Sequence, residues 1–156
     1  MKKTINILLL SVLLNGAGSC IKDKGCQDKT VQSEQAAIQA YATANGINAV
    51  AHSSGMYYEI ISAGSGVSPT PYSTVTVRYT GKLLDGTVFD SQTGAGVTFP
   101  LGQAIYGWQL GLPLIHKGGS IKLIIPSSLA YGCGGKSPTI PGSAILYFDI
   151  QLVDVL

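Results

Sequence analysis

The residue types that most often perform covalent chemistry are scattered along this chain without the spacing that such chemistry needs. His52 and His116 lie far apart, and neither has a Cys, Asp or Glu at metal-ligand spacing, so both are expected at the surface. Ser127-Ser128 lies in no Gly-x-Ser-x-Gly motif, which leaves a hydrolase triad without support. Gly64-Ser65-Gly66 and Gly134-Gly135 precede no predicted helix that could cradle a phosphate. The sequence therefore predicts no nucleophile, no metal and no cofactor.

Asp90 is the polar residue whose position a hydrophobic core alone does not explain. It follows Phe89 near the end of a predicted strand, where a buried carboxylate without a partner is costly. A polar role in a binding pocket is one interpretation. A salt bridge or hydrogen bond to Arg78 or Tyr79 is the structural alternative, and the sequence leaves both open.

From Gly55 onward the chain shows short strands separated by turn residues. Alternating apolar residues and the Asp85-Gly86 hairpin signal predict the strands. They are expected at residues 56–61, 75–80, 87–89, 97–99, 121–125 and 146–152. Only residues 103–112 have helical spacing, and Pro113 ends them. Because a bare sheet face would be unstable, we predict an α+β fold, a curved antiparallel sheet wrapped around one short helix.

The N-terminal third has a different composition. Residues 1–19 combine a charged start, a short apolar run and a small-residue exit, which is typical of a signal peptide. Its apolar run is too short to span a membrane, which takes roughly 20 residues. Residues 20–32 are polar and are interpreted as an anchor and spacer.

Residues 33–54 are predicted to form a short helix, which ends at Asn45-Gly46, and a linker. A helix of about three turns is marginal alone, so we expect its Ile38/Tyr41 stripe to dock on the following domain. Dimerisation through this helix is the alternative to a monomer. The domain itself is expected to span residues 55–156.

The three cysteines suggest two different chemistries. Cys20 directly follows the small-residue exit, in a position that resembles the lipobox of bacterial lipoproteins, although Ala17 stands where that motif usually has Leu. A lipid on Cys20 would anchor an exported cell-envelope protein to a membrane; a secreted soluble protein is the alternative. Cys26 and Cys133 would then share an oxidising compartment, either as a disulfide or as two free thiols.

The charge balance argues against nucleic acid as a partner. Removal of residues 1–19 takes Lys2 and Lys3 from ten basic residues and leaves eight, against eight acidic residues. Nucleic-acid binding calls for clustered excess Lys and Arg, which the remaining chain lacks.

Several segments in a fixed order carry a family resemblance. They are Val77-Arg78-Tyr79-Thr80-Gly81 with Leu84 to Ser91, Phe99-Pro100-Leu101-Gly102, Ile105-Tyr106-Gly107-Trp108, Ile125 to Gly132, and Ile140-Pro141 with Leu146 to Leu152. This ordered set resembles the FKBP family of peptidyl-prolyl cis–trans isomerases over about residues 55–156. The resemblance implies an enzyme that acts on X–Pro bonds of exported proteins and binds macrolides of the rapamycin type. A proline-binding chaperone module with little turnover is the alternative.

The resemblance also implies a site, an aromatic pocket between sheet and helix that holds a substrate proline ring. Its implied substrate-binding residues are Tyr79, Phe89, Phe99, Ile105, Trp108, Ile140 and Phe148, with Trp108 as the floor. Asp90 and the Tyr131 hydroxyl would be the catalytic polar groups near the twisting amide. Ala104 stands where the family often has a larger aliphatic residue, which would widen the rim.

Overall fold

The computed structural model describes residues 25–156, so the predicted signal peptide and Cys20 lie outside the described residues. In this part of the chain, no helix has both the length and the apolar character to cross a membrane.

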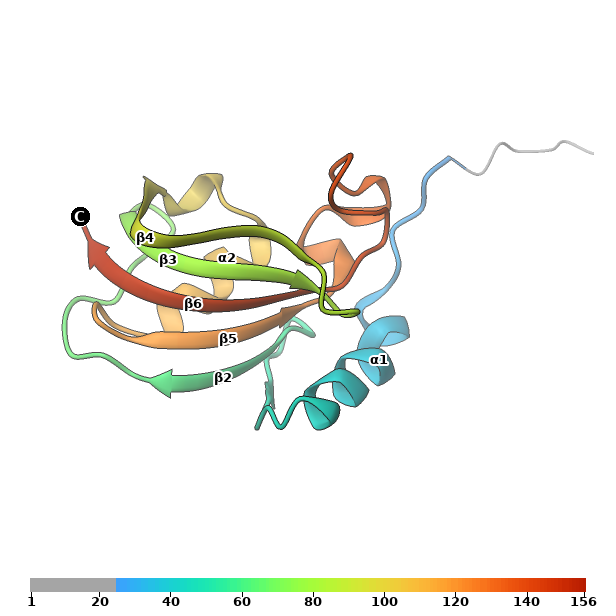
Figure 1. The fold of residues 1–156 in the computed structure, drawn as a ribbon, viewed down its shortest axis with the longest axis horizontal. Helices are drawn as coiled ribbons and strands as arrows, with labels where there is room; N and C mark the ends of the chain where they lie inside the picture. Colours follow the sequence, from blue (N-terminus) through green and yellow to red (C-terminus); the bar gives the residue numbers. More distant parts are fainter. Residues whose placement is uncertain (1–24) are drawn as a thin grey trace, which may run out of the picture.

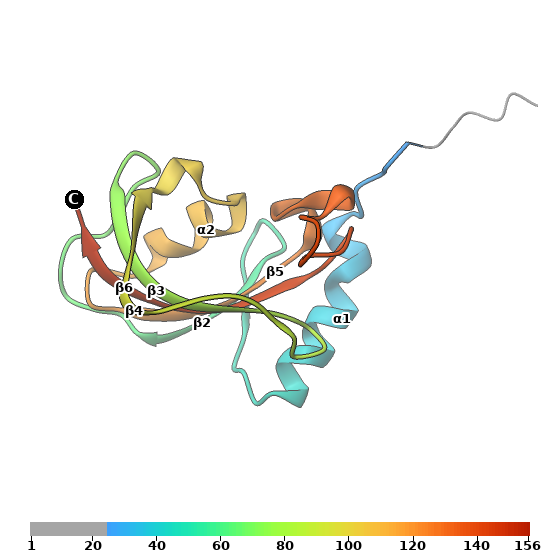
Figure 2. The ribbon, with the colours of Figure 1, turned by 45° about the horizontal axis from the view of Figure 1, so that its top comes forward.

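Six antiparallel strands form one curled sheet in the order β1-β2-β5-β6-β3-β4 (Figure 1). They are β1 (Val50–Ala51), β2 (Tyr57–Ser62), β3 (Thr74–Leu83), β4 (Val88–Pro100), β5 (Ser120–Ile125) and β6 (Leu146–Val155). The helices are α1 (Val31–Ala44) and α2 (Tyr106–Gly111), and 3-10 turns at Leu101–Gln103 and Leu112–Leu114 flank α2. Figure 2 shows α2 on the concave side of the sheet. The predicted α+β class, with a curved antiparallel sheet around one short helix, is confirmed.

The two strands expected at residues 87–89 and 97–99 are parts of a single strand, β4. Its pairing with β3 shifts register between Val77 and Tyr79, which pair with Val97 and Gln92. The residues in between include Gly94 and Gly96, and they interrupt the apolar alternation without ending the strand. Strand β1, only two residues long, was not predicted because so short a pairing leaves no periodic signal.

Helix α1 starts two residues before the predicted start. Thr30 is its N-cap, and the Thr30 hydroxyl accepts a hydrogen bond from the Ser33 backbone N–H at 3.3 Å. The helix ends at Ala44, and the Asn45 side chain donates to the Tyr41 carbonyl. The stop predicted at Asn45-Gly46 is therefore correct.

The sheet carries a hydrophobic cluster on each face because its side chains alternate. On the inner face, α2 and the strands bury a set that includes Trp108, Leu112, Leu123 and Phe148. On the outer face, Ile38 and Ala42 of α1 pack with Tyr57, Ile124 and Tyr147, and the Tyr41 ring centroid lies 5.6 Å from that of Tyr147. The Ile38/Tyr41 stripe thus docks on the domain, as predicted.

The segment before α1 is tied to the domain as well. Cys26 forms a disulfide with Cys133, which settles the question that the sequence left open. The Asp28 carboxylate also accepts a hydrogen bond from the Cys133 backbone N–H at 2.7 Å. Residues 20–32 were predicted as a spacer, but from Cys26 onward the chain is bound to the domain. The sequence could not indicate this, because these contacts join residues more than 100 positions apart.

Two glycines let α2 approach the sheet closely. A Cβ atom at Gly107 would lie 2.5 Å from Cγ2 of Ile125, and one at Gly111 would lie 2.7 Å from Cδ1 of Leu123. Real Cβ atoms do not approach so closely, so a larger residue would push the helix from β5.

Gly107→Ala is expected to lower the free energy of unfolding. Overpacking costs about 1–3 kcal/mol, whereas Ala gains at most about 1 kcal/mol over Gly within a helix, so the net loss should be about 1 kcal/mol. Chemical denaturation would measure it. Gly94→Ala is the matched control, since no atom lies within 4 Å of its added Cβ; equal stability of the two variants would contradict the close-packing argument.

Candidate active site

A cavity of about 390 Å³ opens between α2, the inner face of β3 and β4, and the loop after β5. Its walls combine aromatic and aliphatic side chains with a few polar ones. The lining residues are Tyr79, Asp90, Val97, Phe99, Gln103, Ala104, Ile105, Trp108, Tyr131 and Lys136. Six of the nine residues singled out from the sequence for a pocket are thus brought together.

Strand periodicity explains how the sheet contributes to this cavity. Val75 and Val77 are fully buried on the inner side of β3, and Tyr79 continues that side to the cavity. Phe99 reaches it from the neighbouring strand β4, where Val75 and Phe99 are paired.

Trp108 lines the cavity and is largely buried. It is 5% exposed, and its ring centroid lies 5.0 Å from that of Tyr79, 5.1 Å from Phe148 and 5.8 Å from Phe99. Its indole N–H has no hydrogen-bond partner within residues 25–156. Ring contacts with near-perpendicular or tilted planes therefore hold the indole in place.

Three residues expected in the pocket lie behind its wall. Phe148 is 4% exposed and supports Trp108, while Phe89 packs edge-on against Phe148 at 5.5 Å. Ile140 is 4% exposed and belongs to the inner hydrophobic cluster. None of the three lines the cavity: Phe148 and Ile140 are buried in the core, and Phe89 is half-buried.

Asp90 is exposed, so its carboxylate does not carry the cost of burial considered from the sequence. Its carboxylate accepts hydrogen bonds from the Tyr79 hydroxyl at 2.6 Å and from the Ser91 backbone N–H at 2.8 Å. Arg78 does not pair with it and donates instead to the Gly94 carbonyl and to Gln151. Of the structural alternatives, the hydrogen bond to Tyr79 is the one that forms.

The Tyr79 hydroxyl stays protonated in this environment. Burial, and then the hydrogen bond to the Asp90 carboxylate, raises the pKa of Tyr79 far above its ordinary value. Tyr79 is thus a fixed hydrogen-bond donor that orients Asp90 at the cavity.

Ile105 lies at the rim as the N-cap of α2. The Gln109 side chain donates to the carbonyls of Ala104, at 2.8 Å, and Gly102, at 3.2 Å, and so fixes the turn before the helix. The backbone N–H of Ile105 makes no hydrogen bond among residues 25–156. It is a free donor on a rigid rim.

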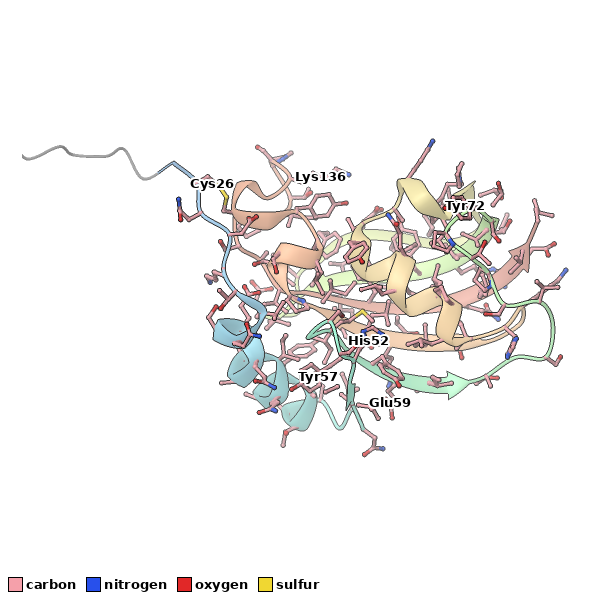
Figure 3. All side chains as sticks on the ribbon, turned by 180° about the vertical axis from the view of Figure 1, so that it is seen from behind. Cys26, His52, Tyr57, Glu59, Tyr72 and Lys136 are labelled. Atoms are coloured by element: carbon pink, nitrogen blue, oxygen red, sulfur yellow. A yellow bond between two sulfur atoms is a disulfide. The ribbon has the colours of Figure 1, made fainter. Side chains whose placement is uncertain are left out.

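The sequence did not single out Val97, Gln103 or Lys136 as site residues. Lys136 lies in the loop after Tyr131, with its Nζ 5.6 Å from the centroid of the Tyr131 ring. Figure 3 shows Lys136 at the same end of the molecule as Cys26. No periodic pattern identifies a loop residue of this kind, whereas Val97 could have been found from its alternation with Phe99.

A second hollow of similar volume lies against Tyr147, on the outer face of the sheet. Its lining is mostly charged or hydrogen-bonding and includes Arg78, Lys82 and Asp149. It lacks the group of packed rings that closes the inner cavity. His52 is half-buried and His116 is exposed. No group of three metal-binding side chains occurs in the described part of the chain.

The fold and the inner cavity define a class of protein, an α+β domain in which a half-open antiparallel sheet and a short helix enclose an aromatic pocket. Residues 66–153 match the family described as FKBP-type peptidyl-prolyl cis-trans isomerase. The chain belongs to this family.

Individual relatives agree with this assignment. A probable FKBP-type peptidyl-prolyl cis-trans isomerase FkpA of Neisseria meningitidis is 40% identical over 136 residues, which cover 86% of this chain and 49% of the relative. The crystal structure of FkpA from Escherichia coli has a TM-score of 0.69 at 37% identity and covers 80% of this chain and 60% of that one. A peptidyl-prolyl cis-trans isomerase from Pseudomonas syringae has a TM-score of 0.68 at 29% identity, with 83% and 98% covered. The chain spans about half the length of the Neisseria relative.

Trp108 is the only tryptophan and therefore reports on the cavity. A proline peptide or a macrolide of the rapamycin type that enters the cavity should change the fluorescence emission of Trp108, because the ligand would alter the surroundings of the indole. Titration followed by fluorescence tests this, with calorimetry as an independent measure of binding. Calorimetric saturation without any spectral change would contradict the floor assignment.

Proposed function

We propose that this protein accelerates cis–trans isomerisation of X–Pro bonds in exported proteins and so assists their folding. The observation that carries the proposal is the cavity itself, aromatic-walled, floored by Trp108 and bordered by the free N–H of Ile105. The substrates are segments of protein chains that contain proline, where uncatalysed isomerisation takes tens of seconds and limits folding.

The reaction needs an environment rather than a nucleophile. Resonance of the C–N bond creates a rotation barrier of about 18–20 kcal/mol. Twisting the amide returns electron density to nitrogen and reduces the polarity of the carbonyl. A cavity that excludes water therefore binds the twisted amide better than the planar one, which is the requirement for acceleration.

Each of the nine site residues named from the sequence has a role in this mechanism. Tyr79, Phe99 and Trp108 enclose the proline ring, with Phe89, Phe148 and Ile140 supporting these walls from behind. The Ile105 N–H binds a substrate carbonyl and fixes the peptide. Asp90, oriented by Tyr79, and the Tyr131 hydroxyl face the twisting amide as its polar neighbours.

A protease-coupled assay on a proline peptide tests the function. Acceleration that a macrolide ligand of the rapamycin type suppresses would support the proposal. A folded protein that binds such ligands but gives no acceleration would be a proline-binding chaperone module instead.

Asp90→Leu and Tyr131→Phe should each lower kcat/KM by roughly tenfold, since one polar contact with the transition state, at the value of one hydrogen bond, is worth about 1.4 kcal/mol. Stability should change less than activity, because the Asp90 side chain is exposed and Tyr131→Phe keeps the ring. The coupled assay and thermal unfolding measure the two effects. Complete inactivation of a folded variant would contradict the desolvation mechanism, and full activity in both would leave catalysis to the apolar walls.

Cys20 is proposed to carry a lipid that anchors the mature protein to a bacterial envelope membrane, facing the periplasm or the cell surface. Wild-type protein should then partition with membranes and show added lipid mass, whereas Cys20→Ser should be released with its isomerase activity intact. Cell fractionation with mass spectrometry checks this. Soluble wild-type protein with an unmodified Cys20 would rule out the anchor.

A further inference from the structure

The N-terminal segment binds, from outside the cavity, the loop that forms one of its walls. Tyr131 and Lys136 reach the cavity from the loop that follows β5, and α1 lies beside that loop (Figure 1). Contacts from Glu34, Asp28 and Cys26 all end on this loop. They do not touch the cavity themselves.

Glu34 makes the most buried of these contacts. Its side chain, in the first turn of α1, is 2% exposed. One carboxylate oxygen accepts a hydrogen bond from the Ser127 backbone N–H at 2.8 Å, and the other accepts one from the Ser127 hydroxyl, also at 2.8 Å. Neither salt bridge found within residues 25–156 involves Glu34.

A buried carboxylate of this kind is a poor way to gain stability alone. Its desolvation is costly, and apolar side chains of similar size often stabilise a buried site as well or better. Two charge-assisted hydrogen bonds from Ser127 do, however, fix the orientation of that residue relative to Glu34. The position of the helix N-terminus also favours the negative charge.

The two attachment points bracket Tyr131. Ser127 precedes it by four residues, and Cys133, held by the Asp28 carboxylate and by the disulfide to Cys26, follows it by two. With both ends fixed to the N-terminal segment, the intervening loop has little freedom to turn the Tyr131 side chain from the cavity. A polar group acts on a reacting bond only when it is held near the productive geometry.

We propose that Glu34 is a positioning residue for the cavity, which holds the 127–133 loop so that the Tyr131 hydroxyl faces the reacting amide. The proposal rests on the proposed isomerase function. Glu34 acts through Ser127 and Tyr131 and touches no substrate.

A double-mutant cycle with Tyr131→Phe tests this role. Glu34→Gln keeps the shape but removes the charge and one acceptor, and Ser127→Ala removes one of the same bonds from the other side. Each should lower kcat by roughly three- to tenfold with little change in KM, and the loss should vanish in the Tyr131→Phe background, because coupled residues are not additive. All variants are assayed below their unfolding transitions.

Glu59→Gln is the matched control. Glu59 is a half-buried carboxylate 3.4 Å from Lys122, on β2 and away from the loop. Glu59→Gln should leave kcat unchanged. Any effect of this variant on activity should be the same in the Tyr131→Phe background.

Hydrogen exchange supplies a measure that needs no activity. Glu34→Gln should speed amide exchange in residues 127–136 and leave β3 and β6 protected. Wild-type protein without isomerase activity would overturn the proposed function. If the wild type is active, any one of three results would overturn the positioning role. These are a normal kcat in Glu34→Gln, additive losses in the double-mutant cycle, and unchanged amide exchange in the loop.

Discussion

The close approach of helix α2 to strand β5 determines where every other part of the cavity lies. Gly107 and Gly111 leave the space that Ile125 and Leu123 of the sheet occupy. Only with the helix at this distance can Trp108 contact the rings of Tyr79, Phe99 and Phe148 at once. The cavity is therefore a consequence of packing, since Trp108, which lines it, is part of the hydrophobic core.

Strand β5 links the packing on one face of the sheet to the packing on the other. Leu123 and Ile125 of β5 face α2, whereas Ile124 between them packs beneath α1. A single strand is thus held from both sides, and the chain that follows it carries Tyr131. The N-terminal segment from Cys26 belongs structurally to this domain, because its disulfide and the hydrogen bonds of Asp28 and Glu34 end on that following loop.

The electrostatics of the cavity suit a reaction that transfers no charge. The Asp90 carboxylate already has two hydrogen bonds, and Tyr79 stays protonated because burial raises its pKa. Neither group is arranged as a proton acceptor for a substrate. The Ile105 N–H, on a turn fixed by Gln109, is a donor without a partner among residues 25–156, and it can fix a carbonyl without chemistry.

The sequence by itself determined the fold class, because alternation on strands and the spacing around Trp108 are local properties of the chain. The aromatic residues of the pocket were implied by the family resemblance. The sequence also predicted the end of α1 and the Ile38/Tyr41 stripe that docks on the sheet. It divided β4 in two, since the register shift interrupts the alternation without ending the pairing.

Only the tertiary structure decided which residues line the cavity and which stand behind them. Phe89 and Phe148 were expected in the pocket with Tyr79 and Phe99, yet they pack against each other and do not line the cavity. Asp90 proved exposed, and Lys136 came to the cavity from a loop without any pattern. The contacts of Cys26, Asp28 and Glu34 join residues about 100 positions apart. Such contacts depend on how the strands bring distant segments together, which no local spacing records.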